Sequence, residues 1–227
     1  MKLDLKKLKL REVNEKLQNL DRKQNDRDFT IINPEGNHAV CAGLTKEMNI
    51  KIKGHVGYYC AGMNQKAFIT IDGNVGTGVA ENMMSGKVHV KGNASQSAGA
   101  TAHGGLLIID GDTSSRCGIS MKGIDIIVKG SVGHMSGFMS QSGNLIVCGD
   151  AGEALGDSLY ETNIYIKGKV KSLGADCVEK KMDKKHIKKL NLLLKEANIK
   201  NYKAENFKRY GSARKLYNFK IDNLSNY

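Results

Sequence analysis

The sequence predicts an all-β protein: a right-handed parallel β-helix of about seven 19-residue coils, with helical caps at its N- and C-termini. Three observations support this prediction. A five-residue pattern that ends in glycine recurs seven times at a fixed interval of 19 residues. Within each copy, branched aliphatic residues alternate with variable ones, as in a strand with one buried face. The segments before and after the repeats have the apolar spacing of amphipathic helices instead.

The repeat is marked by its last residue, as in "IKIKG" at Gly54 and "ITIDG" at Gly73. The seven repeat glycines are Gly54, Gly73, Gly92, Gly111, Gly130, Gly149 and Gly168. The position seven residues after each of them is always alanine or glycine. A fixed period of this length indicates a solenoid, in which small residues let the backbone turn and the coils stack closely. We therefore interpret the repeat glycines as corner residues of the coils.

The composition of the repeat decides which kind of solenoid is expected. A 19-residue unit with short β segments and Gly, Ser, Ala and Asn residues between them has no room for a helix, which argues against a leucine-rich repeat. Among solenoids, the parallel β-helix is the type that fits a repeat without a helix. Left-handed β-helices of the acyltransferase type repeat a hexapeptide, and that pattern is absent here, so the right-handed form is favoured.

A glycine-rich stretch at residues 67–83, "AFITIDGNVGTGVAENM", has the look of a phosphate-binding turn. A dinucleotide site requires a helix that begins at the glycines and presents free N–H groups to the phosphates. Only residues 79–86 separate the last of these glycines from the next strand-like run, which is too short for a crossover helix. Turn glycines are the better interpretation.

We divide the chain into an N-terminal helical cap at residues 1–35, the β-helix at residues 36–177, and a C-terminal helix with a basic arm at residues 178–227. In the first flank the apolar residues fall on one helical face: Leu10, Val13, Leu17 and Leu20. In the last flank they do likewise after a predicted N-cap at Asp183: Ile187, Leu190 and Leu194. Solenoids need such caps because a bare terminal coil exposes core and unpaired strand edges. The basic, aromatic stretch at residues 206–223 fits no coil.

The net charge of +12 invites a nucleic-acid function until the charge is located along the chain. Residues 36–176 hold 12 basic and 11 acidic side chains, whereas residues 177–227 hold 14 and 5. The basic tail lacks interleaved aromatic residues in its lysine run, so a solvated helix face is the better interpretation than a phosphate-binding one. The sequence contains no signal peptide and no apolar run long enough to span a membrane, so we expect a cytoplasmic protein with no nucleic-acid or membrane partner.

The sequence predicts no catalytic, cofactor-binding or metal-binding residue in this chain. The cysteines form no Cys-x-x-Cys pair and no cluster spacing, and we expect reduced core residues: Cys41, Cys60, Cys117, Cys148 and Cys177. The histidines fall in different columns of the repeat and so do not converge on a metal: His55, His89, His103 and His134.

Carboxylates near the turns leave a second class of function open. Pectin-cleaving β-helices use surface acids, and this chain has several at neighbouring coils: Asp110, Asp112, Asp150, Glu153 and Asp157. Asp72, Lys91 and Asp110, however, share the column before the repeat glycine, and their mixed signs predict pairing between coils. Aromatic residues, which line polysaccharide grooves, make up only 6% of the chain. A self-contained hydrolase is therefore the less favoured alternative.

An apolar stripe is predicted on the outer face of the strands, in the column between the two buried aliphatic residues. The first three members of this column are polar, but the last four form a candidate docking stripe: Ile108, Ile127, Ile146 and Tyr165. A soluble monomer seldom leaves such a stripe bare. A partner subunit is one cover, and the chain's own helix near residues 183–198 is the favoured one, because it follows the last coil and has a matching apolar face.

Several long stretches give the chain a family resemblance: "NHAVCAGL", "GHVGYYCAGMN", "GISMKG", "GHMSGFMSQSGNLIVCGDAGEALGDSLYE" and "KSLGADC". They resemble the Gly-x-Gly-x-Gly family, best known as the C-terminal domain of the glutamate synthase large subunit, and the match runs from about Arg11 to Phe219. The resemblance implies a right-handed β-helix without cofactor or catalytic residue. It also implies partners: a glutaminase-type amidotransferase subunit and an FMN-binding glutamate synthase subunit, with FMN and an iron–sulfur cluster on those partner subunits.

The resemblance leaves the type of complex open. The same fold is found in one of the subunits of formylmethanofuran dehydrogenase and in an N-methylglutamate-synthase type of complex. The stretches "GISMKG" and "GEALGDSLYE" are more similar to the glutamate synthase branch than to the formylmethanofuran branch. No residue separates the glutamate synthase type from the N-methylglutamate type.

Overall fold

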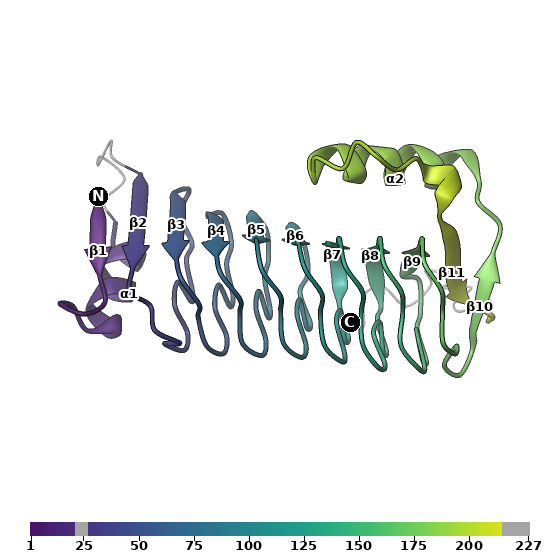
Figure 1. Ribbon diagram of the computed structural model, residues 1–227, viewed down its shortest axis with the longest axis horizontal. Helices are drawn as coiled ribbons and strands as arrows, with labels where there is room; N and C mark the ends of the chain where they lie inside the picture. The colour runs from purple at the N-terminus through teal and green to yellow at the C-terminus, as the bar shows by residue number, and fades with distance from the viewer. Residues whose placement is uncertain (21–26, 215–227) are drawn as a thin grey trace, which may run out of the picture.

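The computed structural model describes residues 1–20 and 27–214, which form one elongated solenoid with a single row of strands (Figure 1). The strands are β1 (Lys2–Asp4), β2 (Asp28–Ile32), β3 (Asn49–Lys53), β4 (Phe68–Asp72), β5 (Lys87–Val90), β6 (Leu106–Ile109), β7 (Lys122–Val128), β8 (Ser142–Val147), β9 (Asn163–Ile166), β10 (Cys177–Lys180) and β11 (Lys208–Ser212). The helices are α1 (Leu10–Gln18), α2 (Lys184–Glu196) and the 3-10 turn η1 (Ala204–Asn206). The predicted all-β class and parallel β-helix of about seven coils are confirmed.

The strands pair in the register that the 19-residue period predicts. Ile50 of β3 lies beside Ile69 of β4, and the same phase continues through Val88 and Leu107 to β9. All neighbours from β1 to β9 are parallel. The inward residues of every strand from β3 to β9 are buried, and together they form the long core of the solenoid. Hydrophobic burial on one face of each strand is thus what fixes the register.

The repeat glycines from Gly92 to Gly168 make room for side chains of the preceding coil. A Cβ atom on Gly92 would lie 2.2 Å from Oδ1 of Asn74. That oxygen accepts a hydrogen bond from the backbone N–H of Asn93, one coil later, at 2.8 Å. The same bond recurs along the corner, where each of these side chains accepts the N–H of the residue 19 positions later: His55, Asn74, Asn93, Asp112, Ser131 and Asp150. We call this row the corner ladder.

After the corner the chain forms an arch in which every second residue has a left-handed backbone. In the second coil, Gly78, Ala80 and Asn82 have φ values of 73°, 56° and 55°. Gly78 and Asn82 donate their N–H groups to the following coil, at 3.0 and 2.9 Å, whereas Ala80 donates to Cys60 of the preceding coil at 2.9 Å. The N–H groups of every second arch residue thus point along the solenoid axis in alternating senses, whereas Glu81 and Met83 donate within their own coil to Gly78 and Ala80.

At the N-terminal end, β1 and β2 extend the sheet beyond the first repeat glycine, within the segment expected to be a helical cap. Helix α1 covers the core beside them, with Val13 and Leu17 buried. Asn14 holds the helix to the turn before the first repeat strand, because its side chain donates to the carbonyl of Ala39 and accepts the N–H of Cys41. The predicted cap helix is thus present, together with two strands that the sequence pattern did not reveal.

At the C-terminal end, α2 begins after Asp183, as predicted, and lies along the outer face of the sheet (Figure 1). The chain then returns through η1 to β11, which inserts between β9 and β10 with antiparallel pairing. The stretch expected to be a basic arm fitting no coil therefore contains a strand of the sheet, and its remainder, residues 215–223, lies outside the described residues. Neither α2 nor any other helix of the described segments is long and apolar enough to cross a bilayer.

The apolar stripe is covered by α2. Ile108, Ile127, Ile146 and Tyr165 form a second apolar cluster with Leu190, Leu193 and Leu194 of the helix. Lys189 of the helix also pairs with Asp125 of β7 at 2.8 Å. Strand β6 is consequently buried on both faces, whereas β3 alternates between buried and exposed residues.

All five cysteines are free and buried. Burial raises the pKa of Cys60 to about 12, and it raises the pKa of Cys117 to about 12 as well. The thiols therefore stay protonated at neutral pH and act as small apolar fillers of the core.

We expect Ile127→Asp to lower the free energy of unfolding by at least about 3 kcal/mol, because it removes a large buried aliphatic group and places a carboxylate beneath α2. Urea unfolding followed by circular dichroism measures this. The matched control is Thr70→Asp, which lies in the same column on the uncovered half and should change stability by less than about 0.5 kcal/mol. An Ile127→Asp protein as stable as wild type would contradict the coverage of the stripe by α2.

The native thiols should resist alkylation. With a pKa of about 12, only about one Cys60 side chain in ten thousand is a thiolate at pH 8. Iodoacetamide at pH 8 should therefore add no mass to the native protein within an hour, and five additions after denaturation, as measured by intact mass spectrometry. Rapid modification of Cys41, Cys60 or Cys117 in the folded protein would contradict their place in the core.

Candidate functional site

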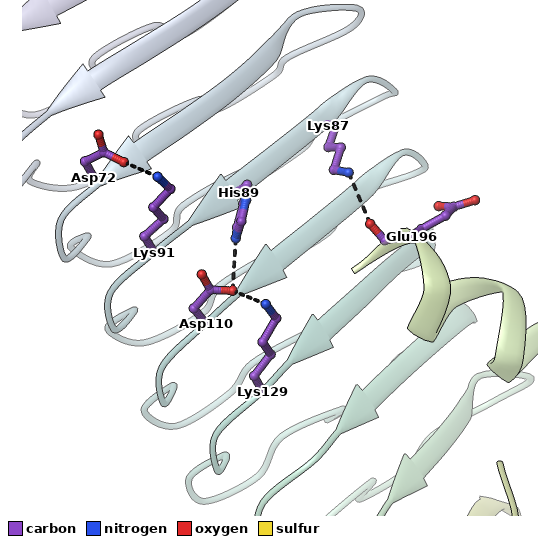
Figure 2. A network of polar contacts seen from close by, with 7 residues as sticks. All are labelled: Asp72, Lys87, His89, Lys91, Asp110, Lys129 and Glu196. Atoms are coloured by element: carbon purple, nitrogen blue, oxygen red, sulfur yellow. Dashed lines mark hydrogen bonds and ion pairs between the residues drawn. The ribbon is translucent and has the colours of Figure 1, made fainter. Parts of the chain in front are cut away.

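A network of ion pairs lies on the outer face of the sheet, beside the end of α2 (Figure 2). Asp72 contacts Lys91 of the next coil at 2.8 Å and Lys51 of the preceding coil at 3.1 Å. Asp110 contacts Lys129 at 2.7 Å and His89 at 2.9 Å. The predicted pairing between coils is confirmed for this column.

The charges of this network are set by the pairing. The hydrogen bond from Lys91 holds the pKa of Asp72 below its ordinary value. Burial raises the pKa of Asp110, but hydrogen bonds from Lys129 and His89 outweigh it, so this pKa is also lowered. Both carboxylates are therefore ionised at neutral pH, and neither is suited to donate a proton as a general acid.

The pair of His89 and Asp110 is the arrangement closest to catalytic machinery. In a hydrolytic triad the histidine also contacts a hydroxyl or thiol nucleophile. Within residues 1–20 and 27–214, His89 hydrogen-bonds Asp110 and no such nucleophile. These two residues stand in different columns of the repeat. Positions two residues apart along a strand point to the same face of the sheet, however. The spacing of these two columns could therefore have predicted the contact between His89 and Asp110.

The other carboxylates considered for hydrolysis are each held by a neighbouring coil or residue. Asp112 and Asp150 belong to the corner ladder, where they accept backbone N–H groups at 2.7 Å. Glu153 pairs with Lys171 at 2.8 Å. Asp157 accepts the hydroxyl of Ser158 at 2.7 Å and the N–H of Ala175 at 3.2 Å. These interactions give each acid a structural role.

The histidines are not brought together. His55 accepts the N–H of Asn74 at the start of the corner ladder, whereas His103 and His134 are exposed on different arches. No group of three potential metal ligands gathers anywhere in the described part of the chain.

A shallow hollow lies on the uncovered half of the outer face. Its lining residues are Asp28, Phe29, Thr30, Asn49, Ile50, Lys51, Phe68 and Thr70. Phe68 stands half exposed among polar side chains. Small-molecule sites are typically enclosed, and this shallow hollow is open to solvent instead.

Comparison with known proteins places the chain in a family. No family model matches it, and no solved structure matches it. Protein GlxC of Rhizobium meliloti (strain 1021) is 57% identical over 225 residues, which make up 99% of this chain and 99% of that protein. Since the likeness extends over essentially the whole of both chains, the chain belongs to the same family as protein GlxC.

Proposed function

We propose that this chain is a non-catalytic structural subunit of a glutamate-synthase-type complex. In that complex it braces a glutaminase-type amidotransferase subunit against an FMN-binding glutamate synthase subunit, so that ammonia from glutamine is used to make glutamate from 2-oxoglutarate. The observation that carries the proposal is the resemblance of long arch and strand motifs, above all residues 133–161, to the domain with that role in glutamate synthase. FMN and the iron–sulfur cluster belong to the partner subunits.

The geometry supports a bracing role because the polar groups of the solenoid hold its coils together. The corner ladder and the ion pairs of Asp72 and Asp110 link neighbouring coils, and α2 spans the outer face of several strands. A stack linked in this way resists bending, which a subunit that fixes the distance between two partners requires.

Reconstitution tests the proposal. The chain should elute in one complex with the glutaminase-type subunit and the FMN-binding subunit of the same organism. Glutamine-dependent glutamate formation should fall about 100-fold when the chain is omitted, because the two active sites are then no longer held together. Ammonia-dependent activity of the flavin subunit alone is the control, since it should not need the chain.

Two outcomes would overturn the proposal. One is full glutamine-dependent activity of the two partner subunits without the chain. The other is failure of the chain to join them while it binds a molybdopterin or tungstopterin dehydrogenase, which would indicate the formylmethanofuran type of complex. Use of methylamine by the reconstituted complex, with N-methylglutamate as product, would indicate the N-methylglutamate type.

The isolated chain should be colourless and inactive. We expect no bound flavin, iron or nucleotide, and no release of ammonia from glutamine, because the candidate acids serve structural bonds. Absorbance spectra, metal analysis and an ammonia assay measure this. A stoichiometric yellow cofactor, or ester or polysaccharide hydrolysis that a single acidic substitution abolishes, would favour the hydrolase alternative instead.

A further inference from the structure

The first turn of α2 contains a histidine whose ring serves as a hydrogen-bond acceptor. His186 is the third residue of the helix, and its Nδ1 atom accepts the backbone N–H of the N-cap residue Asp183 at 3.2 Å. In this position of a capping box the acceptor is usually a glutamate or glutamine side chain. A neutral imidazole can accept the bond, but a protonated imidazole carries a hydrogen on both ring nitrogens and cannot. The bond at the start of α2 therefore requires a neutral His186.

The surroundings of His186 favour its neutral form. The residue is only 9% exposed. Burial lowers the pKa of His186, and the charges of Arg209 and Lys185 lower it further, whereas the carboxylate of Asp183 acts in the opposite direction. That carboxylate lies 3.7 Å from Nδ1, but its side chain is 53% exposed, so water screens its charge. In the described part of the chain, these are the charges that act on His186.

The cation on β11 is held in place beside the start of the helix. Arg209 donates from Nε and Nη2 to the carbonyl of Lys181, at 3.0 and 2.8 Å, and from Nη1 to Oδ1 of Asn163 at 2.9 Å. Its charge therefore cannot easily move away when His186 gains a proton. A protonated His186 would also stand at the N-terminus of a helix, where the helix dipole disfavours positive charge.

We propose that His186 is a pH-dependent clasp, which holds the first turn of α2 on the sheet when neutral and releases that turn when it gains a proton. Three effects of the proton act together on this turn: the loss of the bond to Asp183, the repulsion from Arg209, and the unfavourable position at the helix N-terminus. The rest of the helix keeps its leucine contacts with the apolar stripe and the ion pair of Lys189 with Asp125. Release of the first turn would thus expose the part of the stripe beneath it.

The direction of the pH dependence follows from the lowered pKa. The unfolded chain has the ordinary histidine pKa of 6.5, so it binds a proton more readily than the folded chain does. The stabilisation from neutral His186 is therefore complete above about pH 6.5 and is lost as the pH falls from there through the folded-state pKa. The inference does not depend on the proposed function, because the isolated chain contains every group involved.

Hydrogen exchange of the isolated chain at pH 7.5 and pH 5.0 tests the clasp. After correction for the intrinsic pH dependence of exchange, the amides of residues 184–190 should lose protection at least about fivefold at pH 5.0, the size typical for loss of a helix cap. His186→Gln keeps an acceptor in the capping box without titrating, so its protection should be equal at both pH values. The matched control is His103→Gln, which removes an exposed histidine on an arch and should behave like wild type.

The outcomes decide for or against the clasp. Loss of protection in wild type and His103→Gln, with none in His186→Gln and none in β4, supports it. Equal protection of residues 184–190 at both pH values in wild type overturns it, as does the same loss in His186→Gln or an equal loss in β4. A second measurement needs no variant: NMR titration of wild type should give His186 a pKa below 6.5, and a value at or above 6.5 overturns the clasp.

Discussion

Hydrogen bonds directed along the solenoid axis are the constraint on which the rest of this structure depends. A coil buries one face of a short strand. The peptide groups in its turns, however, would mostly lack hydrogen-bond partners if they could pair only within their own coil. The alternating left-handed arch and the corner ladder pair those groups with the coils on either side. Each coil must therefore repeat the backbone of its neighbours closely, and this requirement explains why the period stays at 19 residues and why a Cβ atom on Gly92 has no space.

The same constraint shapes the two ends and the outer face. A terminal coil has neighbours on one side only, so β1, β2 and α1 complete one end, and β11 and β10 complete the other. Helix α2 adds a different kind of contact, because it packs across strands that are several coils apart. In the outward-facing column of the sheet, the polar residue His89 is followed by Ile108, which is the first member of the column that α2 covers. The residue types in this column therefore match the packing of the helix.

The core of the fold was predictable because burial leaves a periodic trace in the sequence. The glycine column, the strand register and the match of Leu190 and Leu194 to the apolar stripe all follow from alternation and helical spacing. Strand β11 was not predictable in this way: it pairs antiparallel and belongs to no repeat, so no neighbouring copy reveals it. The contact of His89 with Asp110 and the left-handed positions of Ala80 and Asn82 depend on side-chain direction and backbone conformation, which residue types alone report poorly.

The insertion of β11 between β9 and β10 bears on the order in which the chain is completed during synthesis. Residues 28–166 can stack coil by coil as they leave the ribosome, since each strand finds its partner already in place. Strand β9 cannot do so on its far side, because its neighbour there is made about 40 residues later, after β10 and α2. Until those residues emerge, both the edge of β9 and the stripe that α2 covers face solvent or a chaperone. The segment that forms α2 and β11 thus determines when the nascent protein stops exposing surfaces that aggregate.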